Sequence, residues 1–378
     1  MLGISSSPSK RLLLIAEHEA GFEITRVRIA SEGKSVAVLS SVFVSDARRF
    51  FHPLKVGESI EVALGSAHAT TVEASLSLAR DNAATIITEN EMDHLVFKGL
   101  WEFLHQHRAW AAKKMKISDL SLVLASIEVK DVMLGSHHVF NPIGFKGETV
   151  TLRLRGTFVA RELLPVLERV KSWGTLTVIE EGVALADAIP QDECFVVCAD
   201  RKTTSVFWKG RGVIRYVEEI AWGTELFAKA LGESLGLEYD TAVRILTYVS
   251  ERGASPSVMR HCDSVLRKQY DALYDAVHSE ALKKKAGVKR AEVFFYFKDM
   301  TIPRFLADAV KGREIRIDEY MERAEYSIET KKRTVFDPAM SQTTLALLLS
   351  AEHVPKYDFL NQLLLRRARW LIPHFSLQ

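Results

Sequence analysis

Three strand-like stretches lie near the start of the chain: an apolar run at residues 12–16, and two stretches at residues 22–29 and 35–44 in which apolar and polar residues partly alternate, with the period of two that is typical of β-strands. Glu17-His18-Glu19-Ala20-Gly21 lies between the first two as a polar turn. The chain is therefore predicted to begin with a meander of strands.

Further along, the apolar positions recur every three or four residues, which predicts helices. The first such segment covers residues 89–107, and others cover 163–173, 224–235, 239–249 and 258–285. Thr88 and Glu91 stand at the start of the first segment in the spacing of a capping box, in which the Thr hydroxyl accepts from the N3 amide and Glu91 reaches back.

A β-hairpin is predicted at residues 196–209, followed by a turn at 210–212 and another strand at 213–220. Asp200, Arg201 and Lys202 form its polar tip, and Thr203 begins the returning strand. The second half of the chain is organised around this hairpin, and the segments that follow it up to residue 285 have helical patterns.

The length, charge and hydropathy of the chain bear on how many domains it has and which partners it can bind. The chain has 378 residues, which favours two domains over one simple core. Fifty basic and 48 acidic residues give a net charge of +2, so no global positive field indicates a nucleic-acid partner. No run of 18 apolar residues occurs, so a membrane contact would be made with the surface.

Neither a metal site nor a disulfide framework is predicted. The three cysteines, Cys194, Cys198 and Cys262, are too few and too irregularly placed, which favours a reducing, cytoplasmic compartment. Cys198 as a nucleophile lacks a patterned His or Asn partner, so a buried strand cysteine is the preferred interpretation. His105 and His107 lie two residues apart and do not share a helix face.

Several motifs, taken in order, resemble FtsA, the actin-like bacterial cell-division protein. The motifs are Asn141-Pro142-Ile143-Gly144 with Gly147, the hairpin and strand at 196–216, Ile220-Ala221-Trp222-Gly223-Thr224, and Ile302-Pro303 after the segment 288–301. The resemblance covers residues 11–350 and implies an α/β fold: the two-lobe actin-like (ASKHA) fold with an FtsA-type inserted subdomain.

The resemblance also implies a division of the chain. The expected parts are a disordered tail at 1–10, a first actin-like subdomain at 11–84 and 157–191, an inserted subdomain at 85–156, a second actin-like subdomain at 192–223 and 287–354, a helical subdomain at 224–286, and a C-terminal amphipathic helix at 355–378.

ATP and Mg²⁺ are the family's ligands, but the three loops that would bind them lack the glycines and the carboxylate that this chemistry needs. The degenerate positions are Glu17, Glu19, Cys198, Asp200, Arg201, Lys202, Thr203, Phe297, Lys298 and Asp299. We therefore predict a pseudo-ATPase with no catalytic residues, for which no cofactor is expected. Arg201 and Lys202 either bind another anion as point charges or form a solvated tip.

Residues 356–372 carry a basic amphipathic pattern, which is typical of a helix lying on a membrane surface and resembles the terminal helix of FtsA. The expected membrane-binding residues are Phe359, Leu360, Leu363, Leu364, Arg366, Arg369, Trp370 and Leu371. Almost no linker precedes this segment, so a helix docked on its own domain is the alternative.

In the FtsA family the C-terminal peptide of FtsZ docks on the helical subdomain, which here carries Arg244, Arg252, Arg260, Arg267 and Lys268. These residues either face an acidic peptide or form a solvated helix face. The predicted function is a scaffold on the cytoplasmic side of the cell membrane that anchors FtsZ-type filaments. The fold also allows this protein to assemble with its own copies. A PilM-like scaffold of a type IV pilus or secretion platform is the alternative, and a working sugar-kinase-like ATPase would need the missing loops.

Overall fold

The computed structural model describes residues 10–30, 34–45, 58–172, 174–252, 254–283, 291–298, 312–330, 340–352 and 357–368. The expected disordered tail therefore lies outside the described residues, except for Lys10. The chain divides into two compact units: Met1–Glu17, Gly21–Ala184 and Glu325–Gln378 form the first, and His18–Ala20 and Leu185–Ala324 form the second.

A six-stranded sheet forms the centre of the first unit, in the order β15-β3-β2-β1-β4-β9. Its strands are β1 (Lys10–His18), β2 (Gly21–Ile29), β3 (Ser35–Val44), β4 (Glu58–Leu64), β9 (Gly174–Glu180) and β15 (Ser327–Thr330). The apolar run of β1 is buried throughout, as a strand in the middle of a sheet requires, whereas β2 alternates between buried and half-buried residues. β1 pairs with β4, and β4 with β9, in parallel.

A five-stranded sheet forms the centre of the second unit, in the order β12-β11-β10-β13-β14. Its strands are β10 (Cys194–Ala199), β11 (Thr204–Gly210), β12 (Val213–Ile220), β13 (Glu292–Phe297) and β14 (Arg313–Glu314). β10, β11 and β12 are antiparallel, while β10, β13 and β14 run in parallel. The predicted hairpin is thus confirmed.

The two sheets repeat one topology. Leaving β15 aside, the strands of each sheet lie in the order 3-2-1-4-5 of their own appearance along the chain. In each sheet the first strand also pairs in parallel with the fourth, and the fourth with the fifth. This duplication confirms the predicted α/β, actin-like fold.

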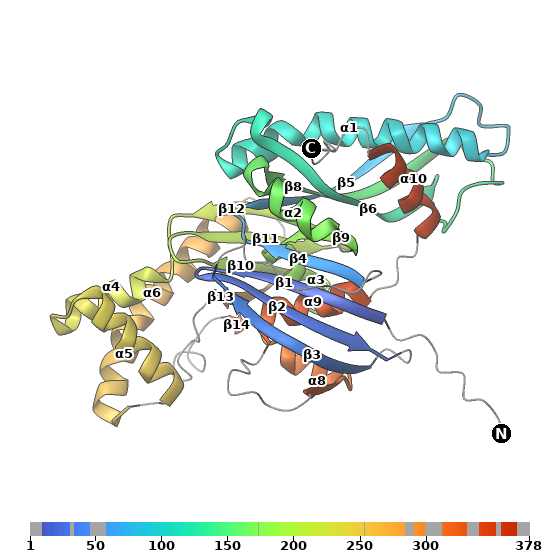
Figure 1. Ribbon diagram of the computed structural model, residues 1–378. Coiled ribbons are helices and arrows are strands. Elements are labelled where there is room, and N and C mark those ends of the chain that lie inside the picture. The colour runs from blue at the N-terminus through green and yellow to red at the C-terminus, as the bar shows by residue number, and fades with distance from the viewer. Residues whose placement is uncertain are drawn as a thin grey trace, which may run out of the picture. The chain divides into compact units, whose positions relative to one another are not determined.

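A four-stranded layer is inserted between β4 and β9. It consists of β5 (Ala69–Ala79), α1 (Glu89–Met115), η2 (Asp119–Ser121), β6 (Leu122–Leu134), β7 (His137–His138) and β8 (Thr149–Ala160), in the sheet order β5-β8-β6-β7. β5 pairs with β8 over its whole length, so the layer begins upstream of residue 85 and ends beyond 156. One face of this sheet is covered by α1 and by α10 (Asp358–Ala368), as Figure 1 shows.

The other helices belong to the two actin-like units. They are η3 (Arg161–Leu163), α2 (Leu164–Lys171), α3 (Glu181–Ala188), α4 (Glu225–Leu235), α5 (Tyr239–Arg252), α6 (Pro256–Lys283), α8 (Ile317–Arg323) and α9 (Gln342–Glu352). α4, α5 and α6 pack together at the place of the expected helical subdomain (Figure 1). α4 ends at Gly236, which adopts the left-handed conformation with φ of 66°.

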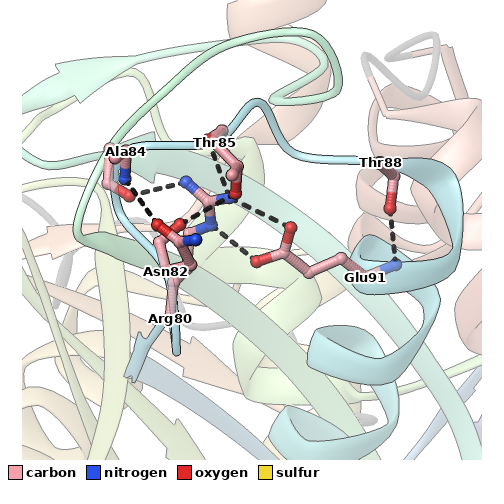
Figure 2. Close-up of polar contacts among 7 residues, drawn as sticks. Arg80, Asn82, Ala84, Thr85, Thr88 and Glu91 are labelled. Atoms are coloured by element: carbon pink, nitrogen blue, oxygen red, sulfur yellow. Dashed lines mark hydrogen bonds and ion pairs between the residues drawn. The ribbon is translucent and has the colours of Figure 1, made fainter.

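The start of α1 is held by the predicted capping box and by one additional residue, Arg80 (Figure 2). Thr88 accepts a hydrogen bond from the amide of Glu91 at 3.2 Å, and Glu91 accepts from the Thr88 amide. Arg80 donates to Glu91 at 2.7 Å and to the carbonyls of Thr85 and Gly147. The hydrogen bonds from Arg80 lower the pKa of Glu91. A single guanidinium therefore joins the end of β5, the start of α1 and the loop before β8.

Candidate functional site

The tip of the β10–β11 hairpin is the place where the family's second phosphate loop is expected. The amide of Asp200 donates to the carbonyl of Thr203 at 2.9 Å, and the amide of Arg201 donates to the Asp200 side chain at 2.6 Å. A phosphate loop needs such amides to point at its anion. Here both amides already have acceptors within the tip.

A neighbouring segment closes the tip from one side. The amides of Thr224 and Glu225 donate to the carbonyls of Asp200 and Arg201 at 2.9 and 3.1 Å. A β-carbon on Gly223 would lie 2.2 Å from the Arg201 carbonyl oxygen, which is closer than any real contact. Glycine is therefore needed at residue 223 for backbone packing against the hairpin.

The charge of Arg201 is balanced by two carboxylates of its own unit. Its guanidinium donates to Glu19 at 2.5 Å and lies 3.9 Å from Glu225. The hydrogen bond to Glu19 raises the pKa of Arg201, and the guanidinium also lies 5.9 Å from the ring centre of Tyr239. Arg201 and Glu19, predicted as members of two separate loops, are thus partners in one ion pair. Lys202 is exposed beside them.

The end of β13, where the adenosine loop is expected, enters an aromatic core. Phe297 is 4% exposed and its ring centre lies 6.3 Å from that of Trp222 and 6.4 Å from that of Tyr270. The amide of Lys298 donates to the carbonyl of Ala199 at 2.9 Å, and Lys298 is itself buried. Asp299 lies outside the described residues. Large side chains therefore stand at the positions where the resemblance to FtsA implies glycines.

Cys198 belongs to the strand pairing of the hairpin. It lies opposite Ser205 of β11 and Tyr296 of β13, and it is half-buried. The hydroxyl of Thr204, the residue after Thr203, donates to the carbonyl of Trp222 at 2.8 Å, so Thr204 also has a structural role.

Glu17, the first candidate of the N-terminal turn, holds a turn of its own unit. Its carboxylate accepts from the amide of Gly65 at 2.8 Å and contacts Nδ1 of His68 at 2.5 Å. Glu17 and Glu19 therefore point to different partners and do not form the acidic pair that the sequence allows.

A buried polar cluster at the end of β9 was not predicted. Glu180 is fully buried and accepts from Lys114 at 2.5 Å, from Ser66 at 2.6 Å and from the amide of Thr71 at 3.0 Å. The cluster joins β9, the end of α1 and the β4–β5 connection. Two adjacent glutamates at the end of an apolar strand, Glu180 and Glu181, were the signal that could have indicated it.

The interpretation of the C-terminal segment as a membrane-binding helix is contradicted for its leucines. Leu360, Leu363 and Leu364 are 1%, 4% and 0% exposed and belong to the core of the four-stranded layer. Phe359 packs against the same core. The alternative is correct for the described residues: α10 is docked on its own domain. Arg369, Trp370 and Leu371 lie outside the described residues.

Polar contacts fix α10 in place at both ends. The Asn361 side chain accepts from the amide of Val129 at 2.7 Å, and the Tyr357 hydroxyl donates to Asp131 at 3.0 Å. Arg366 donates to Asp93 of α1 at 2.8 Å, and Arg367 binds the same carboxylate. These hydrogen bonds lower the pKa of Asp93, with the one from Arg367 as the main cause.

The predicted basic residues of the helical layer, which consists of α4, α5 and α6, differ in their exposure and partners. Arg244, Arg260 and Lys268 are exposed, whereas Arg267 is half-buried and paired with Asp263 at 2.7 Å. The side chain of Arg252 lies outside the described part of the structure. Arg244 of α5 and Arg260 and Lys268 of α6 are therefore accessible to solvent.

Two further kinds of feature are absent from the described part of the chain. No group of three or more His, Cys, Asp or Glu side chains there has the arrangement of a metal site. None of the described helices is both long and apolar enough to cross a bilayer.

Comparisons with known proteins add distant likenesses. No protein-family model matches the sequence, and no curated protein does. The chain is similar to a solved chain of the PilM-PilN type IV pilus biogenesis complex, with 12% identity and a TM-score of 0.47 over 94% of this chain and 98% of that one. It is also similar to the ethanolamine utilization protein EutJ from Carboxydothermus hydrogenoformans, with 13% identity and a TM-score of 0.37 over 91% of each chain.

A third similar structure is MreB 5 of Spiroplasma citri bound to AMPPNP, with 9% identity and a TM-score of 0.37 over 84% of this chain and 94% of that one. Likenesses this distant say nothing of activity or partners. The fold assignment rests on the duplicated sheet topology, and the finer assignment to FtsA-like proteins stays a prediction.

Proposed function

We propose that this protein is an FtsA-like scaffold that holds FtsZ-type filaments at the inner face of the cell membrane and works without hydrolysing ATP. The observation that supports this most is the hairpin tip, where the Asp200 and Arg201 amides are bound within the loop itself. In a chain that keeps the fold of an ATPase, amides that are hydrogen-bonded within the phosphate loop itself are not available to a phosphate. Such a chain uses the fold as a scaffold.

The absence of tight nucleotide binding is tested by isothermal titration calorimetry with Mg-ATP. Triphosphate would have to displace the Arg201–Glu19 ion pair and the packing of Gly223 on the tip. We expect no low-micromolar affinity. Tight binding that Arg201→Ala abolishes would contradict the proposal, because the tip would then be a working anion site.

The partner is expected on the helical layer of α4, α5 and α6. Arg244, Arg260 and Lys268 are exposed cations that suit an acidic peptide tail. The test is a titration of the full chain with a labelled FtsZ C-terminal peptide. Arg244→Glu combined with Arg260→Glu should weaken binding strongly, whereas Arg323→Glu on α8, outside this layer, is the matched control.

A PilM-like scaffold, which grips the cytoplasmic peptide of a pilus or secretion protein, is the second candidate. The docking of α10 favours it, because the terminal amphipathic helix was one of the sequence features that resembled FtsA. Peptides from both kinds of partner, titrated side by side, distinguish the candidates. Selective binding of the pilus-type peptide would replace the first proposal with the second.

A further inference from the structure

β5 is the outermost strand of the four-stranded sheet, and β8 is the only described strand that pairs with it. The pairing is regular over all 11 residues of β5, without a bulge. The outer side of β5 is therefore a sheet edge that faces away from the other strands of its own layer.

Hydrogen bonds at the two ends of β5 show which of its residues bond to β8. The amide of Ala160 donates to the carbonyl of His68 at 3.4 Å, and the amide of Arg80 donates to the carbonyl of Glu148 at 3.0 Å. Hydrogen-bonded and non-hydrogen-bonded pairs alternate along an antiparallel ladder. The even-numbered residues of β5 therefore bond to β8, and the odd-numbered residues direct their main-chain amide and carbonyl groups outward.

The outer edge of β5 is covered near its start and open near its end. The amide of Thr71 donates to the buried carboxylate of Glu180 at 3.0 Å. Ser75, Ser77 and Ala79 are exposed, and their outward amides have no acceptor among the described residues. These three residues present a row of main-chain donors and acceptors that another strand can bind.

This open part of the edge lacks the features that usually keep sheet edges from pairing. Such features are charged side chains, proline, bulges and short strands. Residues 74–79 read Ala-Ser-Leu-Ser-Leu-Ala, without a charge or a proline. On the opposite side of the sheet, by contrast, the pairing of β6 is irregular at two places, and Asn361 accepts from the Val129 amide at 2.7 Å. The layer therefore protects one side of its sheet and leaves β5 ready to pair.

We propose that residues 75–79 pair with the same residues of a second copy of this chain, antiparallel around a two-fold axis at Ser77. Ser77 then faces its own counterpart and Ser75 faces Ala79, so no like charges meet. A two-fold axis perpendicular to the sheet keeps α1 on the same face in both copies, and the two sheets become one. The exposed side chains along this edge are short. They give a foreign peptide little to recognise, whereas a second β5 matches them in size.

The position of α1 fits this arrangement. A β-carbon on Gly99 would lie 3.3 Å from the side chains of Leu78 and Leu152, so α1 passes there above the seam between β5 and β8. Neighbouring strands are about 4.8 Å apart, which places the two-fold axis about 4.8 Å from the seam and the two α1 helices about 10 Å apart. Packed helices lie about 8–10 Å apart. The pairing therefore brings the two helices into contact without a clash.

Sedimentation equilibrium of the full chain over a wide range of concentration tests the proposal and should show a monomer and a dimer. Ser75→Pro removes an outward amide and leaves the bonds to β8 in place. It should raise the dissociation constant at least about tenfold, because each copy loses a hydrogen bond across the interface. Ser75→Thr keeps that amide, so this matched control should dimerise like the unchanged chain. Circular dichroism shows whether each variant is folded.

Charges at Ser77 test the position of the axis. Ser77→Lys would place two cations opposite each other, and Ser77→Asp would do the same with two anions. Each variant alone should dimerise at least about tenfold more weakly, whereas a mixture of the two should form the heterodimer, which native mass spectrometry detects. Ser40→Lys, at an exposed serine of β3, is the control and should leave dimerisation unchanged.

Three outcomes would overturn the proposal. One is a chain that stays monomeric at every concentration, and another is a dimer that Ser75→Pro and Ser77→Lys leave unchanged. The third is an assembly that grows beyond two copies, because a two-fold pairing closes on itself. Dimerisation is measured without peptide or nucleotide, so its result is independent of the proposed function.

Discussion

The side-chain oxygen of Asn361 accepts a hydrogen bond from the main-chain amide of Val129 at 2.7 Å, across 232 residues of sequence. A residue of the last described helix thus satisfies a donor of β6. Asn361→Ala leaves that amide without this acceptor, which should lower the free energy of unfolding by about 1–3 kcal/mol. Urea unfolding followed by circular dichroism measures the loss. Gln362→Ala, at an exposed neighbour, should change little.

The docking of α10 predicts opposite effects for two adjacent leucines. Leu364 is fully buried, so Leu364→Ala should cost about 2–5 kcal/mol of unfolding free energy through lost burial and the cavity left behind. Leu365 is 46% exposed, so Leu365→Ala should stay within about 0.5 kcal/mol of the unchanged chain. If α10 instead lay free for a membrane, the two variants would unfold alike.

Glu61 of β4 should make stability depend on pH. Burial raises its pKa to about 8, and the charge of Glu128 adds to this. Between its ordinary value of 4.5 and about 8 the folded chain holds a proton that the unfolded chain has lost. Stability therefore falls as pH rises through this range.

Glu61→Gln should remove that slope, because the amide does not titrate. Near pH 8 this variant should be more stable than the unchanged chain by a few kcal/mol at most, since each tenfold difference in proton affinity between the folded and unfolded chain corresponds to about 1.4 kcal/mol. Urea unfolding at several pH values tests this, and an unchanged slope would contradict it.

The ion pair of Lys114 and Glu180 should be costly to break on one side only. Both side chains are nearly inaccessible, at 5% and 0% exposure. Lys114→Met leaves a buried carboxylate without its cation, which should cost about 3–5 kcal/mol. Adding Glu180→Gln should recover part of that loss, because the uncompensated charge is gone. Lys113→Met, at an exposed neighbour, is the control, and a double variant less stable than Lys114→Met would contradict this account.

The fold could be predicted from local pattern because its strands are specified locally. The hairpin of β10 and β11 is joined by four residues, and its apolar runs and polar tip are visible in the sequence. The capping box at Thr88 and Glu91 is equally local. Such features depend on residues that lie close to one another in the sequence.

The candidate site could be predicted less well, because its contacts join distant residues. No sequence pattern pairs Glu19 with Arg201, which are 182 residues apart. The apolar stripe of α10 indicates that something covers it, but the pattern is the same for a lipid surface and for a protein core. Asp93 and Val129 bind α10, but the sequence around each of them does not indicate that role.

The late position of α10 in the chain has a consequence for biosynthesis. The four-stranded sheet is complete at Ala160, yet α10 begins about 200 residues later. During translation at about 5–20 residues per second, the apolar face beside α1 therefore waits about 10–40 s for its cover. A nascent chain of this protein presents an uncovered apolar surface for that time, so it should bind holding chaperones during synthesis and release them only when α10 has emerged.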